Sequence, residues 1–236
     1  MQLKILAIIP ARMGSKGVIG KNKKALGNIP LIEWTIQFAK SLENIEILVS
    51  TNDNEILEIS RSFSVIDNGL RPEFLSTDNA LTLDVLRHEL ELYIQSGKQA
   101  DGILLLQPTC PFRLKRVFDE TISSFISSKG EYSFIGVRDV EGNHPCRMKL
   151  IHDGMLINYE DKGFEDMRPR QELPDVYIRN GSLYLTSTEN INNGKLVGSK
   201  QKPVIMSDLL SVNIDSNIDF LVAENFTNEF LEIKDY

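Results

Sequence analysis

Apolar runs of strand length alternate with segments of helical periodicity over residues 4–140, and no other feature limits the fold as much. The apolar runs are KILAIIP (4–10), EILVST (46–51), GILLLQPT (102–109) and YSFIGVRDV (132–140). Segments with helical spacing lie between them, at 30–42, 52–63, 82–97 and 112–128. Continuous apolar runs are typical of strands covered on both faces. The alternation predicts an α/β fold, in which four or five strands form a mainly parallel sheet with helices on both faces.

A different pattern occupies residues 141–186. This stretch contains short strand-like runs and turn residues but no long helix, and it is not a low-complexity sequence. Such a pattern favours an insertion at the sheet edge over a linker. With 236 residues, of which 42% are hydrophobic, the chain is expected to form a single domain (1–236) that includes 141–186 as an inserted subregion.

The C-terminal stretch SVNIDSNIDFLVAENF (211–226) predicts a strand that passes into a final helix. Ser216 and Asp219 have the spacing of a capping box, in which each side chain bonds the backbone N–H of the other residue. The final helix is therefore expected to begin directly after Ser216.

Composition excludes several classes of function. The net charge of −7 argues against nucleic acid as a partner, because an acidic surface repels phosphate backbones. The two cysteines are far apart and lack metal-ligand spacing, which argues against a zinc site or a disulfide framework. The N-terminal apolar run, 5–9, is too short for a signal peptide or a membrane span. We therefore expect a cytoplasmic protein that does not bind membranes.

The loop after the first strand is rich in glycine and in basic residues, in the string IPARMGSKGVIGKNKK (9–24). In an open α/β sheet, ligands bind beyond the carboxyl ends of the strands, where this loop lies. Glycines allow backbone N–H groups to approach a ligand, and Arg and Lys neutralise its charge, so the loop suits a polyphosphate. It is neither a Walker A loop nor a G-x-G-x-x-G loop. A solvated basic turn is the alternative interpretation.

The longer string IPARMGSKGVIGKN (9–22) resembles the start of the CMP-sialic acid synthetases, the N-acylneuraminate cytidylyltransferases, a family that includes CMP-legionaminic acid synthetase-like members. Further segments match in family order, and together they extend over nearly the whole chain. They are PLIEWTI, ILVSTND, RPEFLSTDNA, LLQPTCPFR, RPRQELP, RNGSLYL and NIDSNIDF. Ordered matches of this kind are far more specific than one short glycine pattern.

The resemblance implies a Rossmann-like sheet of nucleotidyltransferase type, with a small inserted dimerisation arm that reaches the partner's active site in a homodimer. It also implies that the anomeric hydroxyl of a nine-carbon 2-keto acid sugar, such as N-acetylneuraminic or legionaminic acid, attacks the α-phosphorus of CTP. The products are a CMP-sugar for surface glycan biosynthesis and pyrophosphate. The implied cofactor is Mg²⁺, and the implied partners are CTP and the acidic sugar.

The family pattern also assigns roles to individual residues. Those implied in catalysis are Arg12, Lys21 and Asp215. The CTP-binding positions are Arg12, Gly14, Ser15, Lys16, Gly17, Lys21, Asn22, Arg71, Ala80, Thr82 and Gln107. The sugar-binding positions are Gln107, Arg147, Arg170, Gln171 and Tyr184, where Arg170 would bind the sugar carboxylate. The metal ligands would be Asp215 and, more weakly or through water, Asn213.

Two positions depart from the family pattern: Arg147 occupies a position that is commonly Lys, and Asn213 replaces the first carboxylate of a D-x-D strand end. Two alternative functions remain open. One is a synthetase for the eight-carbon sugar KDO or another sugar nucleotidyltransferase, and the other is a nucleotide-binding protein without turnover, which Asn213 would favour. For Arg168 and Arg179 the two alternatives are contact with the ligand and salt bridges at an interface.

Overall fold

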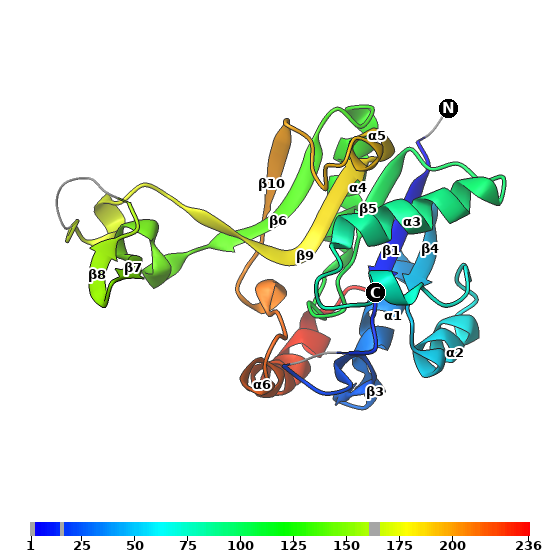
Figure 1. The fold of residues 1–236 in the computed structure, drawn as a ribbon, viewed down its shortest axis with the longest axis horizontal. Coiled ribbons are helices and arrows are strands. Elements are labelled where there is room, and N and C mark those ends of the chain that lie inside the picture. The colour runs from blue at the N-terminus through cyan, green and yellow to red at the C-terminus, as the bar shows by residue number, and fades with distance from the viewer. Residues whose placement is uncertain (1–2, 15–16, 161–165) are drawn as a thin grey trace.

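A six-stranded sheet forms the centre of the computed structural model, which describes residues 3–14, 17–160 and 166–236 (Figure 1). The strand order is β10-β6-β9-β5-β1-β4. The strands are β1 (Ile5–Pro10), β4 (Ile45–Ser50), β5 (Gly102–Leu105), β6 (Ser133–Asp139), β9 (Tyr177–Ser187) and β10 (Gln201–Ile205). All neighbouring pairs are parallel except those of β9, which is antiparallel to both β5 and β6. The mainly parallel sheet is confirmed, with more strands than expected.

Helices cover both faces of this sheet. They are α1 (Leu31–Ser41), α2 (Asn54–Ser62), α3 (Thr82–Gln95), α4 (Lys115–Ser127), α5 (Thr188–Asn192) and α6 (Asn217–Ile233). Successive side chains of a strand point to opposite faces, so Ala7 and Ile9 of β1 pack with α1, α2, α4 and α6, whereas Leu6 and Ile8 pack with α3 and α5. Burial of each such aliphatic side chain contributes about 1.5–3 kcal/mol. The continuous apolar runs thus arise from two cores that share one sheet.

The segment before α6 is not the strand that the sequence predicted. A 3-10 helix, Leu209–Ser211, precedes an extended stretch that pairs with no strand. The backbone groups of this stretch bond elsewhere: the Ile214 N–H donates to the Thr109 carbonyl at 2.8 Å, and its carbonyl accepts from Lys21 Nζ at 2.7 Å. The capping box is confirmed, because Ser216 and Asp219 exchange side-chain and backbone bonds at the start of α6.

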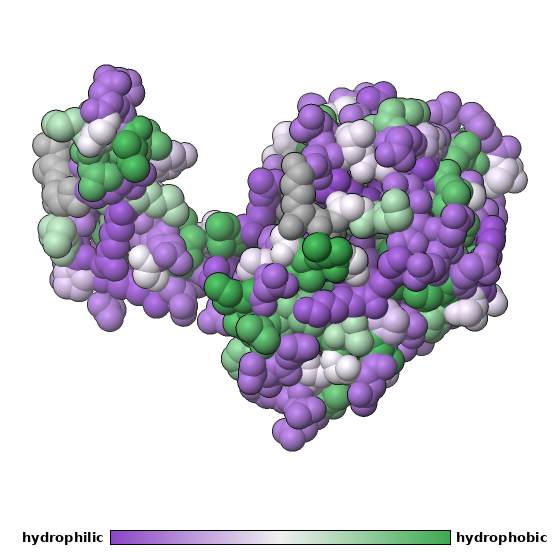
Figure 2. All heavy atoms as spheres, turned by 60° about the horizontal axis from the view of Figure 1, so that its bottom comes forward, coloured by the Kyte–Doolittle hydropathy of each residue, from purple (hydrophilic) through white to green (hydrophobic). Residues whose placement is uncertain are grey.

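Residues 141–160 and 166–176, here called the arm, project away from the body of the protein (Figure 1). The arm contains a hairpin of β7 (Lys149–His152) and β8 (Met155–Asn158), together with short 3-10 helices. The inserted region was expected to extend to residue 186, but its last residues form β9 inside the main sheet. Apolar side chains gather on the arm (Figure 2), where Ile151 is 78% exposed and Leu156 is 71% exposed.

Small elements complete the fold around the first loop. A short hairpin of β2 (Ala25–Leu26) and β3 (Ile29–Pro30) leads into α1, with Gly27 at φ +64° in the turn.

Both cysteines, Cys110 and Cys146, are buried and free. Within the described residues, no helix combines the length and the apolar character that crossing a membrane requires.

Candidate active site

Two cavities lie side by side at the carboxyl ends of the central strands. The first, here called the β1 cavity, has a volume of about 360 Å³ and is lined by Pro10, Arg12, Gly17, Lys21, Asn22, Arg71, Leu75, Thr77, Ala80, Thr82, Val85, Gln107, Pro108, Thr109 and Asp215. The second, here called the β9 cavity, has a volume of about 680 Å³, and its polar lining includes Gln107, Arg138, Arg179, Asn180, Tyr184, Asp208, Ser211 and Asn213. Thr82 and Gln107 line both cavities and therefore mark their junction.

Lys21 places a buried ammonium group at the wall of the β1 cavity. The residue begins a 3-10 helix, Lys21–Lys23, and is 9% exposed. Its Nζ donates to the Ile214 carbonyl at 2.7 Å and lies 3.4 Å from Asp215 Oδ1. The next residue, Asn22, donates from its amide to the Arg12 carbonyl at 3.1 Å. Lys21 thus ties the glycine-rich loop to the stretch before α6, and Asn22 ties the end of the loop to its start.

Two other loop residues are constrained in different ways. The Arg12 guanidinium lies 2.7 Å from the Asp78 carboxylate, which positions this cation. A Cβ atom added to Gly17 would lie 1.8 Å from the Asp215 carbonyl oxygen, which only glycine tolerates. Gly14 does not line the β1 cavity, whereas Ser15 and Lys16, also expected to bind CTP, lie outside the described residues.

Arg71 contributes a second buried cation to the β1 cavity. It is 5% exposed, and its Nε donates to Ser76 Oγ at 3.2 Å. Its Nη2 has no hydrogen-bond partner among the described residues. Burial lowers the pKa of Arg71, an effect that the Glu89 carboxylate opposes and the Arg12 charge reinforces. A buried guanidinium nitrogen without a partner in the wall of a cavity is a ready donor to a ligand.

Glu89 is a residue that sequence reasoning missed. It is 2% exposed and accepts hydrogen bonds from Ser50 Oγ at 2.6 Å and from Asn68 Nδ2 at 2.8 Å. Its carboxylate stabilises the nearby Arg71 charge. The available signal was its position on the apolar face of α3, beside Leu90, where a carboxylate is costly unless it is paired.

Asp215 and Asn213 lie in the extended stretch before α6. Asp215 has a side chain that is 69% exposed, and its Oδ2 accepts from the Asn213 amide nitrogen at 2.6 Å. Asp219 is held by the backbone N–H groups of Asp215 and Ser216. Across residues 3–14, 17–160 and 166–236 there is no group of three or more His, Cys, Asp or Glu residues that could hold a metal ion. Asp215 is therefore the carboxylate here with an oxygen exposed toward the β1 cavity.

The residues expected to bind the sugar fall into two separate groups. Gln107 and Tyr184 line the β9 cavity. Arg147, Arg170 and Gln171 instead lie exposed on the arm, and none of them lines either cavity. Arg170 donates to Asp139 Oδ1 at 3.0 Å. One chain alone does not bring the arm residues to the β9 cavity.

Three arginines near the cavities were not assigned to the site from the sequence, although ligand contact was one of two alternatives for Arg179. Arg138 and Arg179 line the β9 cavity. Arg113 is 1% exposed and donates to the Gln107 carbonyl at 2.7 Å, the Ser182 carbonyl at 3.3 Å and Thr35 Oγ1 at 3.2 Å. Burial lowers the pKa of Arg113 to about 10. Its guanidinium thus fixes the backbone at the junction between the cavities.

The fold and the site together define an α/β nucleotide-binding protein, with a cationic first loop at the carboxyl edge of its sheet. Residues 6–124 match the family model described as Cytidylyltransferase. The chain is 32% identical over 228 residues to CMP-N,N'-diacetyllegionaminic acid synthase of Legionella pneumophila. The aligned region covers 94% of this chain and 95% of that protein. The chain belongs to the cytidylyltransferase family, as the motifs predicted.

Two further comparisons extend this result. The N-acylneuraminate cytidylyltransferase of Escherichia coli O18:K1:H7 is 30% identical over 226 residues, which cover 94% of this chain and 52% of that protein. The chain therefore spans about half the length of that relative. The solved structure of CMP:2-keto-3-deoxy-manno-octonic acid synthetase complexed with CTP superposes with a TM-score of 0.69, at 15% identity over 96% of this chain and 99% of that one. This likeness confirms the fold.

Proposed function

We propose that this cytidylyltransferase joins CTP to a nine-carbon 2-keto acid sugar, either N-acetylneuraminic acid, legionaminic acid or a related acid, and releases pyrophosphate. The observation that carries the proposal is the convergence of Arg12, Lys21 and Arg71 on one cavity that adjoins a second, larger one. Three cations suit a triphosphate nucleotide, and the adjoining cavity leaves room for an acceptor. The names of the relatives support an acidic sugar as that acceptor.

In the proposed reaction, the anomeric hydroxyl of the sugar attacks the α-phosphorus of CTP and pyrophosphate leaves. Negative charge on the phosphate oxygens must be stabilised along this path, and Lys21 and Arg12 supply cations at the β1 cavity. The Nη2 of Arg71, which has no partner among the residues that the structure describes, is a donor for an acceptor atom of the nucleotide. Thr82 and Gln107, at the junction, would orient the two substrates toward each other.

A magnesium ion fits this site as part of a nucleotide complex. Magnesium is commonly bound by one or two carboxylates together with substrate phosphates and water, and Asp215 offers one exposed carboxylate. Bound there, the ion would neutralise phosphate charge. The amide nitrogen of Asn213 donates to Asp215. The side-chain carbonyl oxygen of Asn213 would therefore become a ligand only after the amide group flips.

Changes at these two residues should alter the magnesium dependence in opposite directions. Asp215→Ala is expected to lower kcat at least about 100-fold, because it removes the protein carboxylate from a charged transition state. Asn213→Asp adds a negative charge and is expected to lower the magnesium concentration at half-maximal rate about tenfold, or ~1.4 kcal/mol. Initial rates of pyrophosphate release over a magnesium titration measure both effects. An Asp215→Ala enzyme with the wild-type titration curve would exclude this metal site.

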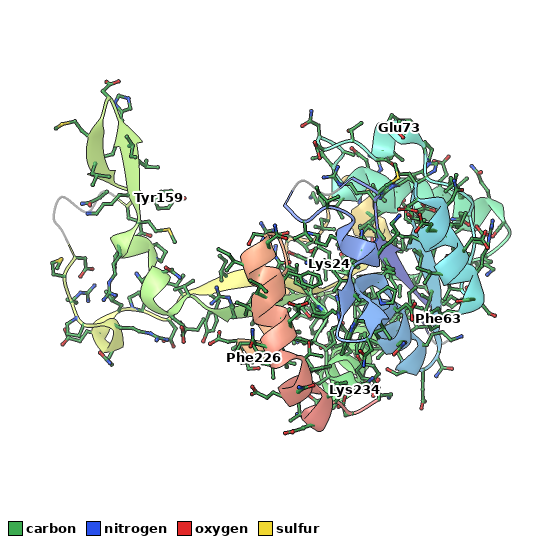
Figure 3. The ribbon with its side chains drawn as sticks, turned by 90° about the horizontal axis from the view of Figure 1, so that it is seen from below. Lys24, Phe63, Glu73, Tyr159, Phe226 and Lys234 are labelled. Carbon is green, nitrogen blue, oxygen red and sulfur yellow. The ribbon has the colours of Figure 1, made fainter. Side chains whose placement is uncertain are left out.

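We further propose that the protein acts as a homodimer, in which the arm of each chain brings Arg147, Arg170 and Gln171 to the partner's β9 cavity. The exposed apolar side chains of the arm support this proposal, because such a patch is typical of a protein–protein interface. Tyr159, labelled on the arm in Figure 3, is 59% exposed and belongs to the same patch. The arm residues would then serve a site in the other subunit.

Pyrophosphate release from CTP tests the proposed function directly. We expect release with N-acetylneuraminic acid or legionaminic acid and none with KDO. Release with KDO alone would favour the eight-carbon alternative, for which the fold likeness to a KDO-type synthetase is the specific observation. CTP binding by calorimetry, with no release from any of the three sugars at any magnesium concentration, would favour a nucleotide-binding protein without turnover.

A further inference from the structure

A buried carboxylate on α3 lies behind the β1 cavity and has no role in the reaction proposed so far. The helix covers one face of the sheet (Figure 1), and its Val85 lines the β1 cavity. Glu89 is four residues further along α3, so its side chain lies on the same face of the helix, one turn behind the cavity wall. It is 2% exposed and lines neither the β1 nor the β9 cavity.

The two oxygens of this carboxylate join two chain segments that meet at Arg71. Oε1 of Glu89 accepts from Ser50 Oγ at 2.6 Å, and Oε2 accepts from Asn68 Nδ2 at 2.8 Å. Ser50 ends β4, and the carbonyl of the next residue, Thr51, accepts from the Arg71 backbone N–H at 2.7 Å. Asn68 precedes Arg71 by three residues. Glu89 therefore bridges the end of β4 and the loop that carries Arg71.

The loop of residues 66–71 runs beside β4 without forming a strand of its own. Ile66 forms an isolated bridge with β4, and Arg71 bonds the backbone just beyond the end of β4. Between these two points the Asn68 amide donates to Glu89. The path of the loop up to Arg71 thus depends on the buried carboxylate.

The charges of Arg71 and Glu89 compensate each other without contact. Neither side chain forms an ion pair with another described residue, and Arg71 Nη2 has no hydrogen-bond partner among them. Burial lowers the pKa of Arg71, and the Glu89 carboxylate opposes this shift. A buried charge is costly unless an opposite charge offsets it. Because Ser50 and Asn68 hold both oxygens of Glu89, the carboxylate offsets the Arg71 charge and leaves Nη2 for a ligand.

We propose that Glu89 is a positioning residue for the nucleotide, which fixes the loop before Arg71 and keeps the Arg71 Nη2 donor available to CTP. This inference rests on the proposed function, in which Arg71 donates to an acceptor atom of the nucleotide. A direct ion pair between the two side chains would satisfy the guanidinium inside the protein and compete with the ligand. A neutral side chain at position 89 would leave the buried guanidinium without compensation and favour its displacement from the site.

Calorimetric titration with CTP tests the inference in the full-length protein, without sugar so that no turnover occurs. Glu89→Gln is nearly isosteric, and its amide can keep both hydrogen bonds, because the Ser50 hydroxyl can rotate and accept. The variant therefore removes the charge with little change in packing. We expect it to raise the Kd of CTP about 5- to 20-fold.

The effect must pass through Arg71, and a double-mutant cycle measures this dependence. We expect Arg71→Gln alone to raise the Kd of CTP about tenfold or more. In the Arg71→Gln background, Glu89→Gln should change the Kd less than about twofold, because no guanidinium remains to be positioned. A purely structural role of Glu89 would weaken CTP binding by the same factor in both backgrounds.

Asn68→Ala tests the bridge while the carboxylate stays in place. Asn68 is only partly buried, and its substitution removes the donor to Glu89 Oε2. We expect the Kd of CTP to rise about three- to tenfold, again only while Arg71 is present. If Glu89→Gln does not fold, the same comparison of Asn68→Ala in the two backgrounds decides the inference.

Glu91→Gln is the matched control, because Glu91 is exposed on the same helix, loses the same charge and lines neither the β1 nor the β9 cavity. Its Kd for CTP should stay within about twofold of the wild-type value. Wild-type CTP binding by Glu89→Gln, or equal weakening with and without Arg71, would overturn the inference. A wild type that does not bind CTP has the same consequence. A wild type that binds CTP and shows the coupling, yet releases no pyrophosphate with any of the sugars, would support the inference and contradict the proposed function.

Discussion

Lys21→Ala is expected to lower kcat for pyrophosphate release by about 100-fold or more, while the KM for the sugar changes less than about threefold. The ammonium group lies in the wall of the β1 cavity, where its charge would stabilise phosphate oxygens that become more negative in the transition state. The interaction is stronger in the transition state than in the ground state, so its loss should appear in kcat. Steady-state rates at saturating CTP and magnesium measure it.

The same substitution also removes a hydrogen bond, and this second effect must be separated from the first. Without Lys21 the Ile214 carbonyl loses its 2.7 Å donor, which costs about 1–3 kcal/mol of stability if the group stays buried. Rates should therefore be compared well below the Tm of the variant. A variant with wild-type kcat, or one in which only the KM for CTP rises, would remove Lys21 from transition-state stabilisation.

Lys24→Ala is the matched control for Lys21→Ala. Lys24, labelled in Figure 3, lies three residues further along the same loop and lines neither cavity. Its ammonium lies 3.8 Å from the centroid of the Phe220 ring. Loss of that cation–π contact should cost about 0.5–1 kcal/mol of stability. The kcat of Lys24→Ala should remain within about twofold of wild type. A similar loss of rate in both variants would indicate a general effect of loop charge.

The fold could be predicted because its main signal is local. The strands β1, β4, β5 and β6 place side chains in both cores, so their apolar runs are continuous and easily distinguished from the helical segments. The prediction of a strand before α6 was wrong for the opposite reason. Its apolar residues, Val212 and Ile214, resemble a strand, but strand formation requires a neighbour with free backbone groups, and here Thr109 and Lys21 provide the bonds instead.

The β1 cavity of the candidate site could be located in the sequence, because a single loop after β1 carries many of the residues that line it. Arg138 was not selected, and ligand contact was only one of two alternatives for Arg179, because the lining of the β9 cavity depends on the pairing of two strands that are distant in sequence. Arg113 was missed because its three acceptors, on α1, on β9 and after β5, are brought together only by tertiary packing. A sequence motif identifies residues within one loop, whereas cavities formed between strands require the register.

Gly17→Ala is expected to lower kcat/KM about 100-fold or more, although it adds only one methyl group. That methyl carbon would lie 1.8 Å from the Asp215 carbonyl oxygen, a separation that real Cβ contacts do not reach, so the loop or the stretch before α6 must move by more than 1 Å. Displacements of this size can cost about 100-fold in rate when they separate groups that act on one substrate. Here they would separate Arg12 and Lys21 on one side from Asp215 on the other.

Gly14→Ala provides the comparison within the same loop, because a Cβ atom at Gly14 meets nothing within 4 Å. We expect it to lose less than about tenfold in kcat/KM. The overpacking at Gly17 should also lower stability by about 1–3 kcal/mol, and each kcal/mol corresponds to roughly 2–4 °C in Tm for a chain of this size. Thermal unfolding and steady-state kinetics of both variants test the argument together. Equal rates for Gly17→Ala and Gly14→Ala would mean that the loop and the Asp215 segment need not be in contact for catalysis, and the close approach at Gly17 would then serve only packing.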